Sequence, residues 1–455
     1  MRKTARLAIL LLLSALFHVS CNKDEPAPTQ EIRIFNHKTT DYEGGWAHEW
    51  MQLCYQLVRD NALEAPEAAR VYGYMGLCTW ESVCHGIPEA KSLEGQIMEY
   101  PQAPATDPYK EYDWVIVLAR AMEAMIPAVI DNLSDAQLNQ IKTLANQQEN
   151  LRMQTGLSQY VLIDSRSLGE RVGQRLVERA EADGRDIILN IDPVLPLRDA
   201  THHWYWAPAQ PGQSAVEPLW GAVHPFVVAD NQVCESEGPL PYSESPNSAF
   251  YAEALEVRNI TPSPANIAIA YHWEDGPGRT GTSPGHWMSI ARQILKSQER
   301  NLADCAKTYC LLGLAAADTY GSCWSMKYKF YLLRPATYIN ELIAPGWKPL
   351  LFTPASPDHI SASAAMGGAG SAILVALLGD VAFNDKTHQG SPLYTPSGGP
   401  FLLSERAFAS ISQAGEEAAE SRVVGGVAFR RAKDQGLATG RCVSEQVLGA
   451  LDFGF

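Results

Sequence analysis

The chain has 455 residues and a formal net charge of −15, and 46% of its residues are hydrophobic. This hydrophobic content is ample for a buried core, and a helical enzyme of this length can form a single unit. The acidic surface argues against binding to nucleic acid and against docking on anionic lipid, because both are negatively charged. No run of basic residues overrides that charge, so no nucleic-acid partner is expected.

Residues 1–20 have the features of a signal peptide. A positively charged start precedes an apolar stretch at 7–19, which is too short to span a membrane. Cys21 then lies where a bacterial lipoprotein carries its lipidated cysteine. We therefore predict an exported lipoprotein of the cell envelope, held at the outer membrane, on its periplasmic or surface face, through the lipid alone. A tether would span 21–35, and 36–455 would form one helical domain.

Eight cysteines besides Cys21 remain in the exported chain, where disulfides can form. Their spacings match neither Cys-x-x-Cys nor a zinc pattern, so no metal site is predicted from them. The spacings do not determine any disulfide pairing. Four cysteines lie in apolar helical runs and are predicted to be buried free thiols: Cys54, Cys78, Cys305 and Cys310.

Apolar residues recur every three or four positions along most of the chain, which predicts an all-α fold. The helix between Pro66 and Gly86 is apolar nearly all round, so we expect it to be central. Residues 185–245 break the helical rhythm with many prolines and short apolar runs. We expect a long irregular excursion with a short hairpin there, and loops of this length are usually functional or packed as lids. Other helices are expected from Trp46, over 113–132, from Ser134, around Leu168 to Gly184, and over 246–257.

The second half of the chain predicts a long helix over 302–333 that carries Lys327. Residues 361–378 are rich in Ala and Gly; they are just long enough to suggest a membrane span, but serines interrupt them. Such a density of small residues indicates close helix packing in the core of a soluble protein. A polar loop is expected over 379–400, followed by a helix that Ser404 caps and that reaches Arg422.

His286 follows a loop expected over 276–285, and a structural hydrogen bond is the interpretation we favour for it. Another helix is expected over 289–300.

Lys327 and Arg334 are seven residues apart, which is about two helical turns, so both would project from one helix face. Pro335 disfavours helix at the preceding residue, so the helix is expected to end at Arg334. Ser361 would lie at a helix N-terminus, where free backbone N–H groups favour anions. Together with Arg422 these side chains are what a tetrahedral oxyanion needs, because Arg, Lys and Ser all donate hydrogen bonds to it.

These segments resemble the vanadium-dependent haloperoxidases and the type 2 phosphatidic acid phosphatases, which share one fold and one anion pocket. The family pattern is Lys-x6-Arg-Pro, then Pro-Ser-Gly-His, then Ser-Arg-x5-His. The first segment here, from Lys327 to Pro335, fits in full. Stretches ahead of it, including 271–278 and 283–287, are also similar, so the resemblance covers roughly residues 40 to 450. It implies two stacked helical bundles whose pocket is covered by the region matching the excursion.

The chain departs from the family pattern at both histidines, because Ser363 and Ala428 stand in their places. In the family, the second histidine ligates vanadium or attacks phosphorus, and the first transfers the proton. Both tasks need an imidazole. The resemblance thus implies anion-binding residues Lys327, Arg334, Ser361 and Arg422 without the catalytic pair, and hence a pseudoenzyme that binds a small oxyanion, vanadate or phosphate, or a phosphorylated ligand.

Two alternatives remain open on the sequence. An active phosphatase or haloperoxidase would need a substitute histidine, and His359 is the best candidate because it lies four residues before Ser363. His286 and His388 are further candidates without a spacing argument. An enzyme with Ser363 as nucleophile ranks lower, since no base lies at a supporting spacing. The sequence does not determine the natural ligand or the oligomeric state.

Overall fold

A computed structural model describes residues 37–100, 102–209, 212–390, 392–394 and 400–455. The predicted signal peptide, Cys21 and the tether lie outside these residues. The first half is built from helices α2 (Gly45–Asp60), α3 (Ala65–Val83), α4 (Trp114–Val129), α5 (Asp135–Met153), α6 (Gln159–Ala182) and α7 (Arg185–Leu189), with short 3-10 turns at Thr39–Asp41 and Cys84–Gly86.

The second half holds the remaining helices and four short strands. The helices are α8 (Ala249–Asn259), α9 (Pro264–His272), α10 (Thr282–Ser297), α11 (Leu302–Phe330), α12 (Pro335–Leu342), α13 (Ala362–Leu378), α14 (Ile411–Val424) and α15 (Arg430–Ala450). Strand β1 (Phe383–Asp385) pairs antiparallel with β4 (Arg406–Phe408), and β2 (Pro392–Tyr394) pairs with β3 (Pro400–Leu402). The prediction of an all-α architecture is confirmed.

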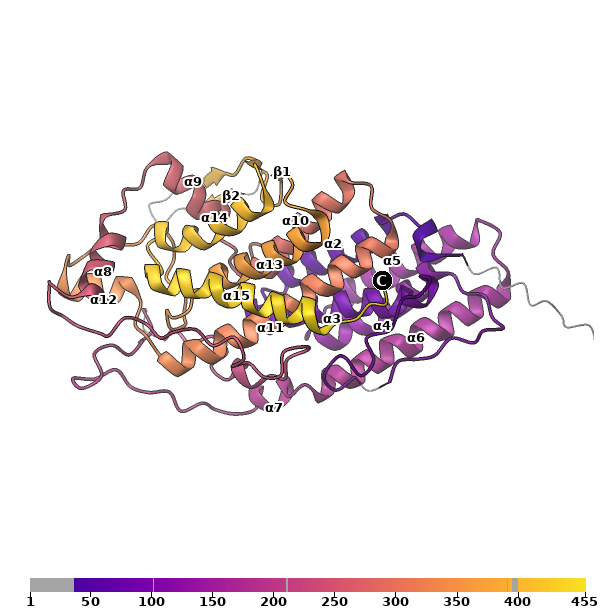
Figure 1. The fold of residues 1–455 in the computed structure, drawn as a ribbon, viewed down its shortest axis with the longest axis horizontal. Helices are drawn as coiled ribbons and strands as arrows, with labels where there is room; N and C mark the ends of the chain where they lie inside the picture. The colour runs from indigo at the N-terminus through magenta and orange to yellow at the C-terminus, as the bar shows by residue number, and fades with distance from the viewer. Residues whose placement is uncertain (1–36, 101, 210–211, 391, 395–399) are drawn as a thin grey trace, which may run out of the picture. The chain divides into compact units, whose positions relative to one another are not determined.

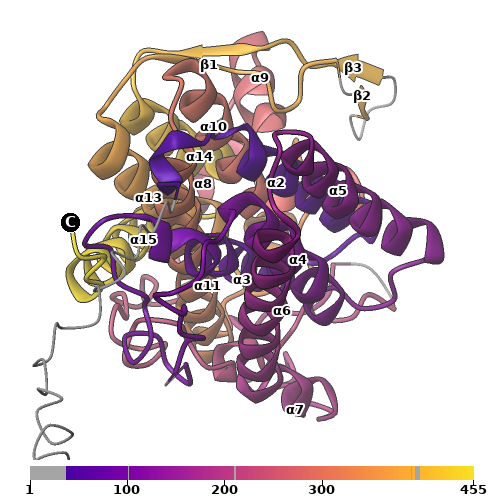
Figure 2. The ribbon, with the colours of Figure 1, turned by 90° about the vertical axis from the view of Figure 1, so that its right-hand side faces the viewer.

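Helix α3 lies at the centre of the core, as its apolar surface predicts. Every residue from Ala68 to Val83 is buried. It packs against α11 and α4, and α4 in turn packs against α5 and α6 (Figure 2). Its glycines allow close contact, because a Cβ on Gly76 would lie 2.3 Å from the backbone oxygen of Tyr309 in α11.

Helices α11, α13, α14 and α15 form the second group of packed helices (Figure 1). The Ala- and Gly-rich α13 packs closely against α15, as its composition predicts: a Cβ on Gly368 would lie 2.3 Å from Leu437 O. Within the described residues, no helix combines the length and hydropathy that crossing a bilayer requires.

The chain turns sharply after α11, and the expectation of one helix carrying both Lys327 and Arg334 is wrong. The helix ends at Phe330, and Tyr331 adopts a left-handed conformation with φ 50°. The next residues bond to other segments instead: Trp206 N–H donates to Tyr331 O at 2.8 Å, and Leu333 N–H donates to Trp204 O at 2.8 Å. These bonds draw the backbone out of the helix before Pro335 is reached.

The excursion over 185–245 is largely irregular, with α7 and a 3-10 turn at Trp220–Ala222. The expected hairpin is not found in its described residues. Tyr205 instead forms an isolated bridge with Leu332, which lies outside the excursion.

The segment after α13 also differs from expectation, since the predicted loop over 379–400 contains strands. Ser410 rather than Ser404 caps α14, accepting a hydrogen bond from Gln413 N. Strand β4 occupies the residues between, and the rings of Phe383 and Phe408 stack across the β1–β4 pair at 5.3 Å.

The cysteines divide into one disulfide and a set of buried thiols. Cys234 in the excursion is bonded to Cys442 in α15. The four predicted thiols are free and buried, as are Cys84 and Cys323. The spacings gave no signal for the disulfide because its cysteines are 208 residues apart.

Candidate functional site

A cavity of about 330 Å³ brings together the residues of all three sequence segments. It lies at the end of α11, the start of α13 and the end of α14, and the loop between α9 and α10 completes it. The predicted residues that line it are Lys327, Arg334, Ser361, Ser363, Arg422 and Ala428.

Lys327 lies in the last turn of α11 and is only 2% exposed. Its ammonium donates hydrogen bonds to Pro357 O at 2.8 Å and to Asp358 O at 3.2 Å. Burial, together with the charge of Arg334, lowers the pKa of Lys327 to about 8. A buried ammonium with a lowered pKa gains most from a nearby anion, because the anion restores the favourable environment that water gave it.

Arg334 is the N-cap residue of α12, where Pro335 occupies the first helical position. Its guanidinium is held from several sides: Nε donates to Ser356 O at 2.7 Å, and its terminal nitrogens donate to Val427 O at 2.9 Å and Ser356 Oγ at 3.0 Å. Asp358 Oδ1 lies 3.3 Å from the same guanidinium. The planar group is therefore fixed in orientation at the cavity wall.

Ser361 is the N-cap residue of α13, and Arg422 lies in the last turn of α14. The helix-start position expected for Ser361 is confirmed. Arg422 Nε donates to Ser363 Oγ at 2.7 Å, and its terminal nitrogen donates to Trp273 O at 2.8 Å. The side chain at one histidine position of the family pattern is thus a hydrogen-bond acceptor for an arginine.

His359, the candidate substitute histidine, is not among the residues that line the cavity. Its Nε2 lies 3.0 Å from Glu237 O and 3.3 Å from Ser236 Oγ, so the ring is bonded to the excursion. Burial lowers the pKa of His359 to about 4. It is therefore neutral at pH 7 and does not line the cavity. Among the described residues, the cavity wall contains no histidine.

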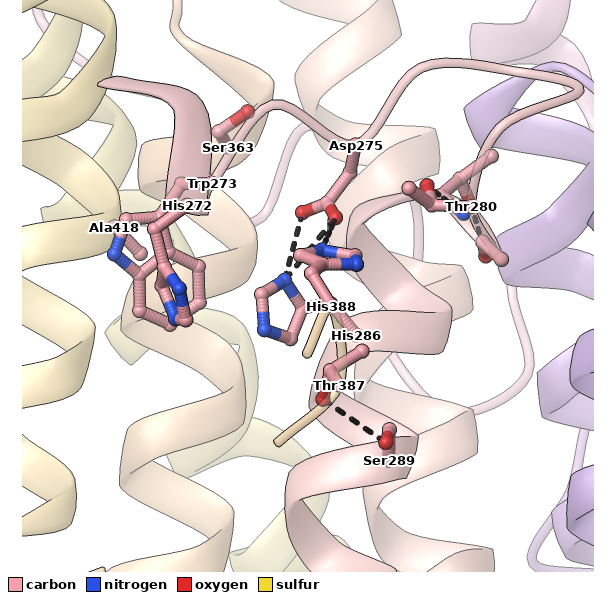
Figure 3. Close-up of polar contacts among 12 residues, drawn as sticks. His272, Trp273, Asp275, Thr280, His286, Ser289, Ser363, Thr387, His388 and Ala418 are labelled. Atoms are coloured by element: carbon pink, nitrogen blue, oxygen red, sulfur yellow. Dashed lines mark hydrogen bonds and ion pairs between the residues drawn. The ribbon is translucent and has the colours of Figure 1, made fainter. Parts of the chain in front are cut away.

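One residue of the cavity wall, Asp275, belongs to a buried network of imidazoles and carboxylates. Asp275 lines the cavity, and both its carboxylate oxygens lie 3.1 Å from His286 Nδ1. His388 Nε2 lies 2.9 Å from Asp275 Oδ1, so the two rings converge on one carboxylate (Figure 3). The other nitrogen of His286, Nε2, lies 2.6 Å from Asp385 Oδ2, which His272 also contacts at 3.0 Å.

The charges of this network stabilise one another. Burial lowers the pKa of His286, but the carboxylates of Asp275 and Asp385 outweigh it and raise that pKa to about 10. Burial raises the pKa of Asp275, but the His286 charge overcomes it and holds that pKa far below its usual value. His286 lies at hydrogen-bonding distance from the carboxylates of Asp275 and Asp385 rather than from a carbonyl, and α10 begins earlier than expected, at Thr282.

Two groups of three residues in this network are of the types that ligate metals: His272, His286 and Asp385, and Asp275, His286 and His388. Each imidazole lies at hydrogen-bonding distance from a carboxylate, so the groups satisfy one another directly. The sequence gave no spacing signal for this network, because Asp275 and Asp385 are 110 residues apart.

Comparison with known proteins identifies relatives of this fold. Residues 307–452 match the family described as the VCPO second helical-bundle domain. A solved bacterial vanadium-dependent iodoperoxidase superposes with a TM-score of 0.80 and 26% sequence identity, over 94% of this chain and 98% of that one. The chain belongs to the vanadium haloperoxidase superfamily.

More distant haloperoxidases share the fold alone. The apo form of a bacterial vanadium-dependent chloroperoxidase has a TM-score of 0.63 at 16% identity, over 86% of this chain and 94% of that one. The holo form has a TM-score of 0.58, also at 16% identity, over 86% of this chain and 93% of that one. No curated protein matches this sequence.

Proposed function

We propose that this haloperoxidase-fold protein binds a tetrahedral oxyanion, or a ligand that carries one, and turns it over little or not at all. The observation that carries the proposal is the composition of the cavity wall in the described residues. The cavity is lined by three cationic side chains of the family pattern and by a serine hydroxyl: Lys327, Arg334, Arg422 and Ser361. No histidine is among its described residues.

The cations are organised to receive an anion. Lys327 and Arg334 are nearly fully buried, so their charges act in a medium of low polarity where an ionic contact is stronger than in water. The Asp358 carboxylate lies 3.3 Å from the Arg334 guanidinium and forms an ion pair with it. A bound dianion would balance the remaining positive charge, and it would meet donors already fixed in place.

The wall fits an exchangeable oxyanion better than a permanently held vanadium centre. Vanadate supplies peroxide activation when an imidazole nitrogen holds the metal, and Ala428 has no atom that could do so. Ser363, at the proton-transfer position, has no titration near pH 7. The residues present would hold the oxygens of vanadate, phosphate or sulfate, and we assign no oxidation step to them.

An active phosphatase or haloperoxidase is the alternative, and it has less support. His359, which would replace the missing imidazole, is bonded to Glu237 O and lies outside the cavity wall. His286 reaches the wall only through Asp275, which it holds in the ionised form.

The location in the cell is a separate part of the proposal. The lipoprotein-like segment ending at Cys21 supports export and anchoring through a lipid at the cell envelope. The acidic net charge of −15 supports a small-molecule ligand rather than nucleic acid.

Anion binding and turnover are measured separately on the purified protein. Vanadate and sulfate are titrated by calorimetry, and Lys327→Ala is expected to raise either dissociation constant by about 10- to 100-fold, because it removes a charged hydrogen-bond donor. Lys348→Ala, a change at an exposed lysine, is the control and should leave binding unchanged.

Turnover is assayed with a generic phosphate ester and, after vanadate loading, with bromide and peroxide. We expect no activity above the uncatalysed rate. Clear turnover that Lys327→Ala abolishes would overturn the non-catalytic part of the proposal, and absence of anion binding would overturn the whole of it.

A further inference from the structure

The cavity has a second wall whose chemistry differs from the oxyanion-binding groups. It is formed by Glu64, just before α3, and by residues 274–279 between α9 and α10. Three carboxylates, of Glu64, Glu274 and Asp275, therefore line the same cavity as Lys327, Arg334 and Arg422. A bare phosphate or sulfate ion gains nothing from them, since like charges repel.

Glu274 has one carboxylate oxygen with a partner and one without. Oε1 forms an ion pair with Arg279, whereas Oε2 is buried and has no hydrogen-bond donor within reach among the described residues. The residue is 5% exposed, so water does not substitute freely for a partner. A buried acceptor without a donor destabilises the folded protein, the more so when it is charged, and a bound molecule that donates to it would remove that cost.

Two neighbouring residues support the same conclusion. Gln213 Oε1 also lines the cavity and is a second buried acceptor without a donor in the described chain. Glu64 forms no ion pair with any described residue, and burial together with the charge of Glu67 raises its pKa. Asp275 differs, because His286 and His388 already satisfy it. Among the described residues, the buried acceptors of this cavity without a donor are thus Glu274 Oε2 and Gln213 Oε1, and Glu64 lines it without an ion pair. A ligand that donates hydrogen bonds and carries positive charge would satisfy all three.

We propose that the cavity binds a phosphate monoester whose other end is a primary amine, that is, an aminoalkyl phosphate. This inference rests on the proposed oxyanion site: the phosphate would contact Lys327, Arg334 and Arg422, and the ammonium would contact Glu274 Oε2 and Glu64. The volume of about 330 Å³ is at the lower end of the range for small-molecule pockets and leaves room beyond a single tetrahedral ion. An ammonium has three donors and no acceptor, which matches the acceptor oxygens that Glu274, Gln213 and Glu64 present to the cavity.

The test compares two esters of equal size by calorimetry on the purified protein. O-phosphoethanolamine carries an ammonium where n-propyl phosphate carries a methyl group, and both present the same phosphate. We expect phosphoethanolamine to bind about ten times more tightly. Glu274→Gln keeps the shape of the side chain and is expected to remove most of that preference while leaving the affinity for propyl phosphate nearly unchanged.

Two further variants separate recognition from a general structural effect. Glu64→Gln should reduce the preference by a smaller factor, because this carboxylate is only partly buried. Glu445→Gln, at an exposed position on α15, is the matched control and should retain the full preference.

The outcomes distinguish this inference from the proposal on which it rests. Equal affinities of the wild type for the two esters would overturn the amine site and leave the oxyanion site unaffected. The same holds if Glu274→Gln weakens the binding of both esters by the same factor. Failure of sulfate and of both esters to bind would overturn the oxyanion site, and the amine site with it.

Discussion

Lys327 is the residue through which the proposed oxyanion binding would depend on pH. Its ammonium is buried in the last turn of α11 and donates hydrogen bonds to the backbone oxygens of Pro357 and Asp358. Burial and the nearby Arg334 lower its pKa to about 8. Oxyanion binding should therefore depend on pH through this residue.

Sulfate affinity is expected to fall as the pH rises through about 8, because Lys327 loses its proton and with it a positive charge. Sulfate is the suitable probe because it stays a dianion throughout. Calorimetric titration from pH 6 to 10 measures the effect, and Lys327→Met should bind weakly with a flatter profile. The control Lys348→Met should keep the wild-type profile. A wild-type affinity that is constant over this range would contradict the role given to Lys327.

At the scale of elements, the contact between α13 and α15 positions the start of α13 and hence Ser361 and Ser363. A Cβ on Gly440 of α15 would lie 1.9 Å from Ala365 O and 2.8 Å from Ala369 N, both in α13. These are backbone atoms, so they cannot move aside without separating the two helices. Ser361 N–H also donates to Ala432 O at 2.9 Å, which ties the N-terminus of α13 to the start of α15.

Gly440→Ala is expected to lower the free energy of unfolding by about 1–3 kcal/mol or more, because the added methyl group overpacks the contact. Gly449→Ala on the same helix is the control: a Cβ there meets no atom within 4 Å. It should raise the stability by roughly 0.5–1 kcal/mol through the helix preference of alanine. Urea denaturation measures both changes. Equal stabilities of the two variants would show that α13 and α15 do not pack as closely as described.

At the scale of the whole described chain, one covalent bond holds the irregular excursion against the helices. Cys234 belongs to the excursion and Cys442 to α15, with 208 residues between them in sequence. The excursion also supplies Gln213 and Val216 to the cavity wall, and Glu237 to the contact with His359. The disulfide therefore stabilises the segment that covers part of the site.

Removing this disulfide by Cys234→Ser with Cys442→Ser is expected to lower the stability by about 2–5 kcal/mol, because the unfolded chain regains the freedom that the bond removes. Thermal unfolding with and without a thiol reductant measures the effect. Reductant should lower the midpoint of the wild type and leave the double variant unchanged. An unshifted wild-type midpoint would contradict a stabilising role for the bond.

Much of the fold could be predicted because helix formation is a local property. The periodic apolar residues predict the helices, the all-round apolar surface of 66–86 predicts a central α3, and the small residues of 361–378 predict close packing. The wall residues Lys327, Arg334, Ser361 and Arg422 were found because their order and spacing follow a known pattern. The hypothesis of a shared helix face failed, however, since contacts between residues 331–333 and the excursion end α11 early.

The sequence alone determined which charges and which helices the protein has, because composition and periodicity are properties of neighbouring residues. Only the tertiary structure decided which of those charges face one another. The pairing of Asp275 and Asp385 through His286, the unpaired oxygen of Glu274 and the bond from Cys234 to Cys442 all join segments from separate parts of the chain or depend on their packing. Local patterns carry no information on such contacts, because they form only when distant elements pack together.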